Sequence, residues 1–330
     1  MSVRVAILDD YQGVAASLAP WADSGLGIEL VVYREPVRDD DQLVDWLKGC
    51  QAVVLMRERT PLKRSVVDRL PDLRLVVTTG MANSAIEPDL GVTVCGTASS
   101  SVPPAELTWA LITALRRNLV VEDRAVREGR WQSTLGEELE GSTLGLVGLG
   151  KIGSRVASVG RAFGMRVLAW SQNLDADRAA GLGVEAVAKD VLLSTSDVVS
   201  LHLRLSDRSR HTIGAPELAA MKPGAVLVNT ARAGLVDTGA LCAALQEGSL
   251  GGAGLDVFDT EPPRPDDPLM TAPRTVLTPH LGDVSRQNYR TYFTQALEDI
   301  EGFFTGAPVR VISEGTRPPT PSGRPSGPRG

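Results

Sequence analysis

A glycine-rich stretch near the middle of the chain restricts the possible folds more than any other feature. It reads Gly148-Leu149-Gly150-Lys151-Ile152-Gly153, and it joins an apolar, strand-like run at 144–147 to a helix-like segment that ends near residue 163. In this setting the first glycine permits a tight turn, the second lets the backbone approach a pyrophosphate, and the third lets the helix pack on the strand. The pyrophosphate would lie at the helix N-terminus, where free N–H groups and the helix dipole favour anions. The stretch therefore predicts a dinucleotide-binding Rossmann domain with these six residues at the cofactor.

Short β-branched runs alternate with helix-like segments along most of the chain, which is typical of parallel sheets built from βαβ units. Pro103-Pro104 opens a helical segment that runs to about residue 129 and separates two series of strands. We expect strands near residues 3–8, 28–32, 52–55, 75–78 and 92–94, and then near 144–147, 166–170, 198–201, 226–229, 253–257 and 276–278.

The predicted fold is α/β, with two Rossmann-like or flavodoxin-like, doubly wound parallel-sheet domains. The amphipathic segment 286–304 follows the last strand and is expected to return to the first domain. Residues 1–103 plus 285–312 would then form one domain, and residues 104–284 the nucleotide-binding domain. Residues 313–330 are mostly Pro, Gly, Ser, Thr and Arg, so we expect a disordered tail there.

Composition and charge limit which partners the protein can bind and which cell compartment it can occupy. With 43% hydrophobic residues, a chain of 330 residues suffices for two domains that each bury a core. A net charge of −6 and scattered basic residues argue against a nucleic acid partner. No apolar run approaches the roughly 20 residues that span a bilayer, so no membrane partner is expected. Cys50, Cys95 and Cys242 lie far apart, which indicates a reducing, cytoplasmic compartment, and no metal site is expected.

The residues after the strand at 166–170 bear on the choice of cofactor. A carboxylate there would bind the ribose hydroxyls and repel a 2′-phosphate, whereas an arginine would accept the phosphate. The positions hold Ser171, Gln172 and Asn173, all neutral, with Asp175 a little further on. We expect the three neutral residues to line the cofactor and NAD to be that cofactor, with NADP as the alternative.

Three residues suited to acid–base chemistry and carboxylate binding follow later strand-like runs. They are Arg232 in Asn229-Thr230-Ala231-Arg232, Glu261 in Asp256-Val257-Phe258-Asp259-Thr260-Glu261-Pro262, and His280 in Thr278-Pro279-His280. A guanidinium can grip a carboxylate with two parallel hydrogen bonds, and an imidazole can exchange a proton near neutral pH. A glutamate can hold that imidazole oriented and protonated. Because ligands bind beyond the carboxyl ends of parallel strands, this set suits hydride transfer to a 2-keto acid.

The motifs GLGKIG, NTARAG, LDVFDTEP and TPHLG occur in an order and spacing that resemble the D-isomer-specific 2-hydroxyacid dehydrogenase family over residues 3–312. The resemblance implies an NAD(P)-dependent oxidoreductase that interconverts a 2-keto acid and a D-2-hydroxy acid. It also implies an active-site cleft between a substrate-binding and a nucleotide-binding domain, and a homodimer. By this resemblance Arg232 binds the substrate carboxylate and carbonyl, Glu261 supports the histidine, and His280 is the catalytic acid and base.

The resemblance also implies binding roles for residues in both domains. In the nucleotide-binding domain, Asp256 would hold the nicotinamide carboxamide, and Thr230, Ala231 and Gly282 would line the cofactor. In the other domain, the loop at 79–83 would bind the substrate carboxylate through backbone N–H groups. The substrate-binding residues of that loop would be Gly80, Met81 and Ala82. Apart from the resemblance, Arg57 and Arg59 follow the strand-like run at 52–55, where Arg57 could bind the substrate or the two could equally form a solvated pair.

Two positions depart from the family pattern. Arg204 follows Leu201-His202-Leu203 where a proline is common, close to the expected cofactor, and it could alter cofactor contacts or reach an anionic group of the substrate. Met81-Ala82 stands where a second glycine is usual, so the class of 2-keto acid is left open. His202, inside an apolar run, is more simply a structural residue, and His211 is expected to be solvated.

Three alternatives to a general 2-keto acid reductase share these motifs or this fold. D-3-phosphoglycerate dehydrogenase is the nearest. Formate dehydrogenase is disfavoured because the histidine there typically works beside a glutamine, where this chain has Glu261. A dinucleotide-sensing corepressor of the same fold would keep these residues but would bind partner peptides, to which nothing in the sequence points.

Overall fold

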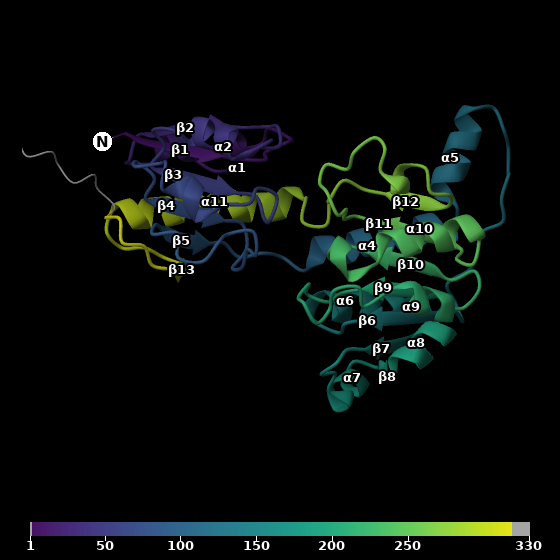
Figure 1. Cartoon of the computed structure of the whole chain (residues 1–330). Helices are drawn as coiled ribbons and strands as arrows, with labels where there is room; N and C mark the ends of the chain where they lie inside the picture. Colours follow the sequence, from purple (N-terminus) through teal and green to yellow (C-terminus); the bar gives the residue numbers. More distant parts are fainter. Residues whose placement is uncertain (1, 319–330) are drawn as a thin grey trace, which may run out of the picture. The chain divides into compact units, whose positions relative to one another are not determined.

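The computed structural model describes residues 2–318 of the chain. They form two compact units, shown in Figure 1. The terminal unit contains the residues up to Ser100 and those from Ser285 onward, and the central unit spans Ser101–Val284. The two ends of the chain therefore share one unit, while the middle of the chain forms the other.

The terminal unit is a six-stranded sheet in the order β13-β5-β4-β3-β1-β2. All pairs are parallel except β13 with β5, which are antiparallel. Strands β3 and β4 have the sequences AVVL and LVVT and are buried on both faces, as parallel strands covered by helices should be. The strands are β1 Val3–Ile7, β2 Ile28–Val32, β3 Ala52–Leu55, β4 Leu75–Thr78, β5 Thr93–Gly96 and β13 Val311–Ser313.

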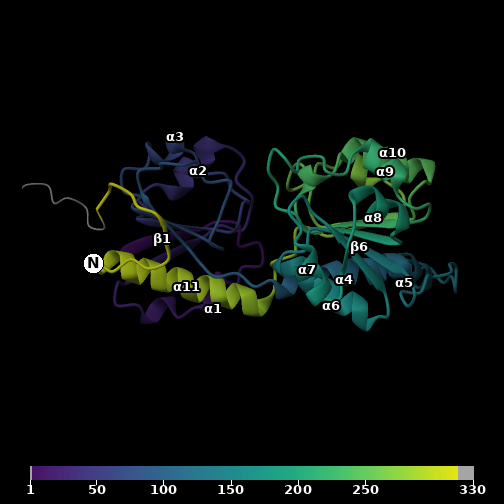
Figure 2. The same ribbon diagram turned by 90° about the horizontal axis from the view of Figure 1, so that it is seen from below.

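Helices cover both faces of this sheet, as Figure 2 shows, with α11 and α1 on one side and α2 and α3 on the other. Helix α11 lies against β4 and β5 and buries Tyr292, Phe293 and Ile300 in the core. The N-caps follow the sequence: the Asp39 carboxylate accepts from Gln42 N–H before α2, and the Ser285 hydroxyl accepts from Asn288 N–H before α11. The helices are α1 Ala15–Leu18, α2 Asp40–Leu47, α3 Arg64–Val67 and α11 Arg286–Phe304, with a 3-10 turn η1 at Trp21–Asp23.

The expectation of disorder from residue 313 onward is wrong for the part of the tail that the structure describes. Ser313 ends β13, and Thr316 N–H donates to the Gly91 carbonyl at 3.2 Å. The Arg317 guanidinium donates to the carbonyls of Leu70 (2.6 Å), Leu73 (3.0 Å) and Val67 (3.1 Å). Backbone hydrogen bonds and one arginine thus order a segment that has little to bury. The remainder of the expected tail, 319–330, lies outside the described residues.

The central unit is a seven-stranded, fully parallel sheet in the order β12-β11-β10-β9-β6-β7-β8. The strand order reverses between β6 and β9, since β6 to β8 extend the sheet on one side and β9 to β12 on the other. Doubly wound sheets bind their ligands at this position. Together the two sheets confirm the predicted α/β class. The strands are β6 Thr143–Val147, β7 Arg166–Trp170, β8 Glu185–Ala186, β9 Val198–Leu201, β10 Val226–Asn229, β11 Gly252–Leu255 and β12 Thr275–Leu277.

Two hydrophobic clusters fill the faces of the central sheet, one under α4 and α6 and the other under α8, α9 and α10 (Figure 2). The long helix expected from Pro103-Pro104 is divided in two, because Asn118 adopts a left-handed backbone with φ +52. Asparagine tolerates this conformation better than most residues. The helices are α4 Val102–Arg116, α5 Leu119–Arg127, α6 Lys151–Ala162, α7 Ala176–Gly181, α8 Lys189–Thr195, α9 Ala215–Ala220 and α10 Thr238–Glu247, with 3-10 turns η2 Ala233–Leu235 and η3 Pro268–Met270. Within residues 2–318, no helix has the length and apolar character required to cross a bilayer.

Candidate active site

The glycine loop between β6 and α6 has the geometry that a dinucleotide requires. Gly148 has a left-handed backbone, φ +108, and a Cβ atom there would lie 2.8 Å from the carbonyl carbon of His202. At Gly153 a Cβ atom would lie 2.3 Å from the Gly148 carbonyl oxygen, so α6 packs directly on the turn. At Gly150, the N-cap of α6, a Cβ atom would meet nothing within 4 Å. The open side of the loop is at the middle glycine, where a pyrophosphate would approach the helix N-terminus.

The other three residues of the loop divide between core and surface. Leu149 is buried and Ile152 packs beside it in the cluster under α4 and α6, whereas Lys151 is exposed. The loop is thus anchored by apolar side chains while its backbone and one lysine face outward. The residues present fit a bound dinucleotide.

The edge beyond β7 carries no carboxylate positioned for a ribose. Gly148 N–H donates to the carbonyl of Trp170, the last residue of β7, at 2.8 Å, so this edge adjoins the glycine loop. Asp175 caps α7 and accepts from the N–H groups of Asp177 (3.0 Å) and Arg178 (3.2 Å). The residues between are neutral: Ser171 is half-buried, and Gln172 and Asn173 are exposed.

His202 adjoins the glycine loop but is not placed as an acid or base. Its Nε2 lies 3.0 Å from the Ser200 hydroxyl, and burial lowers the pKa of the imidazole to about 4. A histidine with this pKa is neutral at physiological pH. The structural interpretation of His202 therefore agrees with its surroundings.

His280 and Glu261 form a hydrogen-bonded pair at the carboxyl edge of the central sheet. His280 Nδ1 lies 2.6 Å from Glu261 Oε2, and Glu261 Oε1 accepts from Phe258 N–H at 3.0 Å. The imidazole is 20% exposed and the carboxylate 30%, so the pair is reachable from solvent yet partly desolvated. With Nδ1 engaged by the carboxylate, Nε2 is the nitrogen left to exchange a proton with a ligand.

The charge of Glu261 is well defined. Burial by itself would raise the pKa of this carboxyl, but the hydrogen bond and charge of His280, the Phe258 N–H and the charge of Arg232 hold the pKa below its usual 4.5. The group is therefore anionic at neutral pH. An anion at 2.6 Å orients the imidazole and fixes which nitrogen carries the shared proton.

Arg232 leaves β10 in a fixed turn. Asn229, the last residue of β10, uses its side chain to accept from Ala231 N–H (3.0 Å) and to donate to the Arg232 carbonyl (2.9 Å). One guanidinium nitrogen, Nη1, donates to the Ala231 carbonyl at 2.6 Å. The structure thus brings Arg232 to the edge where Glu261 and His280 lie, and its charge acts on Glu261.

Asp256 ties down the turn that carries His280. Its Oδ1 accepts from the Thr278 hydroxyl (2.6 Å) and from Leu281 N–H (2.7 Å), and its Oδ2 accepts from Gly282 N–H (2.8 Å). The carboxyl is fully buried, and that burial raises its pKa above the usual value despite the three donors. Between these anchors His280 has a left-handed backbone with φ 52, a conformation that costs energy and persists where the surroundings fix it.

Two threonines complete this region, and sequence reasoning did not single out their roles. Thr278 is the hydroxyl donor to Asp256. Thr108, on α4, donates its hydroxyl proton to the Pro104 carbonyl (2.7 Å) and lies 2.8 Å from the Thr230 hydroxyl. Because a hydroxyl has one proton, Thr230 donates to Thr108 and keeps its own lone pairs for the expected cofactor. No local sequence motif indicates the contact of Thr108 with Thr230, because the two residues lie 122 positions apart in the chain.

In the terminal unit, the predicted substrate residues Arg57 and Gly80 lie together. A Cβ atom on Gly80, where φ is +100, would lie 2.2 Å from Arg57 Nη1, so the guanidinium rests on the glycine backbone. Arg57 Nη1 also donates to the Thr79 carbonyl at 3.3 Å. Gly80 N–H donates to the Thr97 hydroxyl at 3.0 Å, whereas the N–H groups of Met81 and Ala82 have no acceptor among residues 2–318.

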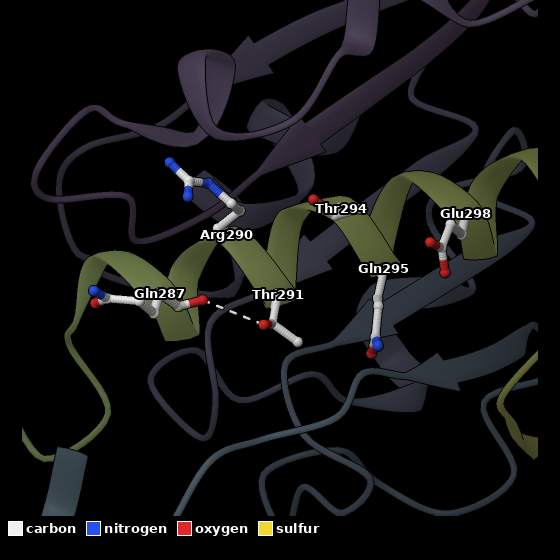
Figure 3. Close-up of a pocket in the computed structure, with 6 residues that line it drawn as sticks. All are labelled: Gln287, Arg290, Thr291, Thr294, Gln295 and Glu298. Atoms are coloured by element: carbon white, nitrogen blue, oxygen red, sulfur yellow. Dashed lines mark hydrogen bonds between the residues drawn. The ribbon is translucent and has the colours of Figure 1, made fainter. Parts of the chain in front are cut away.

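A surface hollow lies on α11, and none of the residues described above lines it. It encloses about 370 Å³ and is lined by residues of that one helix, as Figure 3 shows: Gln287, Arg290, Thr291, Thr294, Gln295 and Glu298. The hollow holds no pair of groups arranged for acid–base chemistry. Across the described part of the chain, no cluster of three His, Cys, Asp or Glu side chains is arranged to hold a metal ion.

Comparison with known proteins gives a consistent result. The sequence profile described as D-isomer specific 2-hydroxyacid dehydrogenase, NAD binding domain, matches residues 109–282. The chain is 41% identical to a glyoxylate reductase of Aeropyrum pernix over 73% of this chain and 76% of that protein. It is 34% identical to a glycerate dehydrogenase of Methylorubrum extorquens over 82% and 88% of the two chains. A solved structure of a phosphoglycerate oxidoreductase from Vibrio cholerae superposes with a TM-score of 0.87 at 39% identity, covering 92% of this chain and all of that one (100%).

The fold, the glycine loop and the matching family profile together define a dinucleotide-binding oxidoreductase, with NAD(P) as the cofactor. The chain belongs to the D-isomer-specific 2-hydroxyacid dehydrogenase family and is an NAD(P)-dependent enzyme of that class.

Proposed function

We propose that this enzyme reduces the carbonyl of a 2-keto acid, with His280 as the proton donor and Arg232 as the carboxylate anchor. Bound NAD(P)H supplies the hydride. The observation that carries the proposal is the 2.6 Å pair of His280 Nδ1 and Glu261 Oε2, held beside a turn that Asp256 fixes.

His280 serves as acid and base through Nε2. In the reduction direction the protonated imidazole gives its Nε2 proton to the carbonyl oxygen, and in the oxidation direction the neutral imidazole takes that proton back from the hydroxyl. Glu261 stays anionic throughout, since its pKa is held below 4.5, and it stabilises the positive charge of the imidazolium. A glutamine here could accept the hydrogen bond but could not stabilise that charge, which is why formate dehydrogenase chemistry is disfavoured.

Arg232 supplies the recognition of the substrate carboxylate. A planar guanidinium can bind both carboxylate oxygens at once, and it polarises a neighbouring carbonyl through its charge. The Asn229 side chain fixes the backbone on both sides of Ala231, so the arginine leaves the strand in one direction. In the terminal unit, we assign the N–H groups of Met81 and Ala82 and the Arg57 side chain to the same substrate.

The substrate class that fits best is a small, unphosphorylated 2-keto acid such as glyoxylate or hydroxypyruvate. Relatives named glyoxylate reductase and glycerate dehydrogenase support this choice. A phosphorylated substrate would require cations for a second anionic group. One candidate, Arg59, donates to the Asp9 carbonyl (3.1 Å) and to the Tyr289 hydroxyl (3.3 Å), and it lies 5.2 Å from the centre of the Tyr11 ring. D-3-phosphoglycerate dehydrogenase is therefore the second choice.

A homodimer through α5 and the segment after it is part of the proposal. Exposed apolar side chains gather there, and Trp131 is 77% and Leu135 93% exposed. Monomeric proteins rarely leave such groups uncovered, so we assign this surface to a second copy of the chain. Leu135→Asp should shift the protein from dimer to monomer in sedimentation velocity; an unchanged sedimentation coefficient would place the interface elsewhere. The other apolar members of the surface are Leu119, Val120, Val121 and Val126.

The cytoplasm is the proposed compartment. Cys50, Cys95 and Cys242 are buried, free thiols, and burial raises the pKa of Cys95 to about 12. Such thiols are inert in a reducing environment and form no disulfide with one another.

The direct test is the loss of reduced-nicotinamide absorbance with glyoxylate, hydroxypyruvate, pyruvate, oxaloacetate and phosphohydroxypyruvate, with NADH and NADPH assayed separately. We expect fastest turnover with the small unphosphorylated acids and a D-hydroxy acid as the product of hydroxypyruvate. Preference for phosphohydroxypyruvate would move the assignment to D-3-phosphoglycerate dehydrogenase. Tight dinucleotide binding without turnover of any acid would favour the dinucleotide-sensing corepressor.

A further inference from the structure

The position where this fold selects between NAD and NADP is unoccupied by any acidic side chain. Ser171, Gln172 and Asn173 are neutral, and the next carboxylate, Asp175, accepts two N–H groups of α7. A carboxylate at this edge would bind the ribose 2′-hydroxyl and repel a 2′-phosphate. No carboxylate is therefore available here to bind the ribose 2′-hydroxyl of NAD, and none is present to repel the 2′-phosphate of NADP.

Arg204 is an exposed cation on the neighbouring loop. His202 N–H donates to the Val147 carbonyl at 2.8 Å, so the chain leaves β9 directly beside the glycine loop. Leu203 lies against that loop, since its Cδ2 would be 3.1 Å from a Cβ atom on Gly148. Leu205, two residues further along the chain, also points inward. Its Cδ atoms would lie 3.2 Å from a Cβ atom on Gly234. Both leucines pack on the core cluster under α8, α9 and α10, which leaves Arg204 between them, exposed at the carboxyl edge.

Internal contacts do not explain this arginine. Its guanidinium forms no hydrogen bond or ion pair with any residue in the range 2–318, and the one bond at this residue is to its backbone carbonyl, from the Ser209 hydroxyl at 2.7 Å. Of the other cations on the β7–β8 side, Lys189 and Arg166 are paired, whereas Arg178 on α7 is exposed and its guanidinium forms no hydrogen bond or ion pair within residues 2–318. Lys189 binds Glu217 at 2.8 Å and lies 5.6 Å from the Trp170 ring centre, and Arg166 binds Glu185 at 2.6 Å. Arg204 is thus available to an anion at this edge, and it lies on the loop that adjoins the glycine loop.

We propose that Arg204 binds the 2′-phosphate of NADPH and makes this chain bind the phosphorylated dinucleotide at least as tightly as NADH. This inference rests on the proposed function only for the presence of a bound dinucleotide. It reverses the sequence-based preference for NAD.

The distances permit this contact. Strands β9 and β7 are separated by β6 alone, which puts their ends about 10 Å apart at the usual strand spacing. An extended arginine and a phosphate group on the ribose together cover such a span. Two neutral amides, Gln172 and Asn173, lie at the far side as further donors to the phosphate oxygens.

The experiment is titration calorimetry of the whole protein with NADPH and NADH, and with the fragments 2′,5′-ADP and 5′-AMP. Arg204→Gln should weaken NADPH and 2′,5′-ADP by about tenfold to a hundredfold, the usual value of hydrogen bonds between charged groups, and leave NADH within twofold. Arg208→Gln, at an exposed arginine of the same loop, is the matched control and should change neither.

Equal weakening of NADPH and NADH would show that Arg204 binds the shared pyrophosphate, and no weakening of either would show a solvated arginine; both results overturn the inference. Because these titrations contain no keto acid, their outcome is separate from that of the turnover assay. If the enzyme reduces a keto acid but Arg204→Gln does not weaken NADPH more than NADH, the role of Arg204 is contradicted and the proposed function stands. If Arg204→Gln selectively weakens NADPH but the enzyme turns over no keto acid, the proposed function is contradicted and the role of Arg204 stands.

Discussion

The two ends of the carboxyl edge of the central sheet are stabilised in different ways. At the proposed catalytic end, Asp256 accepts three hydrogen bonds from the turn around His280, and Glu261 uses both carboxylate oxygens. At the other end, Gln172 and Asn173 are exposed and the Arg204 guanidinium has no partner within residues 2–318. Under the proposed function, the chemistry depends on a fixed hydrogen-bond network, and the choice of cofactor depends on a few exposed side chains. Changes at the catalytic end should alter rate, and changes at the other end should alter affinity.

A large effect on the catalytic side of this comparison is expected from Arg232. Arg232→Gln should lower kcat/KM for a 2-keto acid by about a hundredfold or more, because a bidentate, charge-assisted contact is lost. Arg232→Lys keeps the charge but loses the two parallel hydrogen bonds of the guanidinium, so its kcat/KM should lie between those of wild type and Arg232→Gln. Steady-state kinetics with hydroxypyruvate would measure this, while calorimetry checks that NADPH affinity is kept. A kcat/KM within threefold of wild type would remove Arg232 from the site.

A methyl group at Gly150 should affect affinity alone. Since a Cβ atom there would meet nothing within 4 Å, Gly150→Ala should leave the unfolding temperature nearly unchanged. It should weaken both dinucleotides by about tenfold or more, because the backbone could no longer approach the pyrophosphate. Gly181→Ala is the control, as its Cβ position is equally open and lies at the end of α7. Unchanged affinity for both dinucleotides would place the pyrophosphate elsewhere.

Removal of the Thr278 hydroxyl should slow turnover without loss of cofactor. Thr278→Val takes one of two donors from Asp256 Oδ1, so the His280 turn is less fixed, and kcat should fall by about threefold to thirtyfold. Thr278→Ser restores the donor and should restore kcat. The dissociation constants for NADH and NADPH should stay within twofold. If affinity fell and kcat did not, Thr278 and Asp256 would belong to cofactor binding and not to positioning of the histidine.

The smallest effect is a difference in acid stability. The pKa of Glu261 is lowered in the folded protein, so its contribution to stability is present above the unfolded value of 4.5 and is lost as the pH falls through the lower folded value. Glu261→Gln cannot lose that contribution. The unfolding temperature of wild type should therefore fall more steeply than that of Glu261→Gln below pH 4.5, as measured by scanning calorimetry. Parallel curves would mean that the His280–Glu261 pair does not act on stability.

Features that depend on short, contiguous motifs were predictable from the sequence. The glycine loop, the α/β class, and the position of Arg232, Glu261 and His280 at strand ends follow from short motifs and from the rule that ligands bind at one edge of a parallel sheet. The pairing of His280 with Glu261 follows the same motifs, and the structure shows it at 2.6 Å.

Features that depend on distant or single residues were not predictable. Thr108 meets Thr230 only because α4 packs on the central sheet. The division of the expected long helix rests on the backbone of Asn118, and the order of the tail up to residue 318 rests largely on Arg317. Such contacts leave no periodic pattern in the sequence, since each is decided by packing between segments far apart in the chain.

The proton donor is the central claim, and two histidines allow a matched test. His280 and His211 both have left-handed backbones, φ 52 and φ 49, so replacement by asparagine has a similar backbone cost at each. The measurement is hydroxypyruvate reduction and NADPH binding for His280→Asn and His211→Asn. His280→Asn should lower kcat by about 10² to 10⁴ with NADPH binding retained, and His211→Asn should change neither. A kcat for His280→Asn within threefold of wild type would contradict the account.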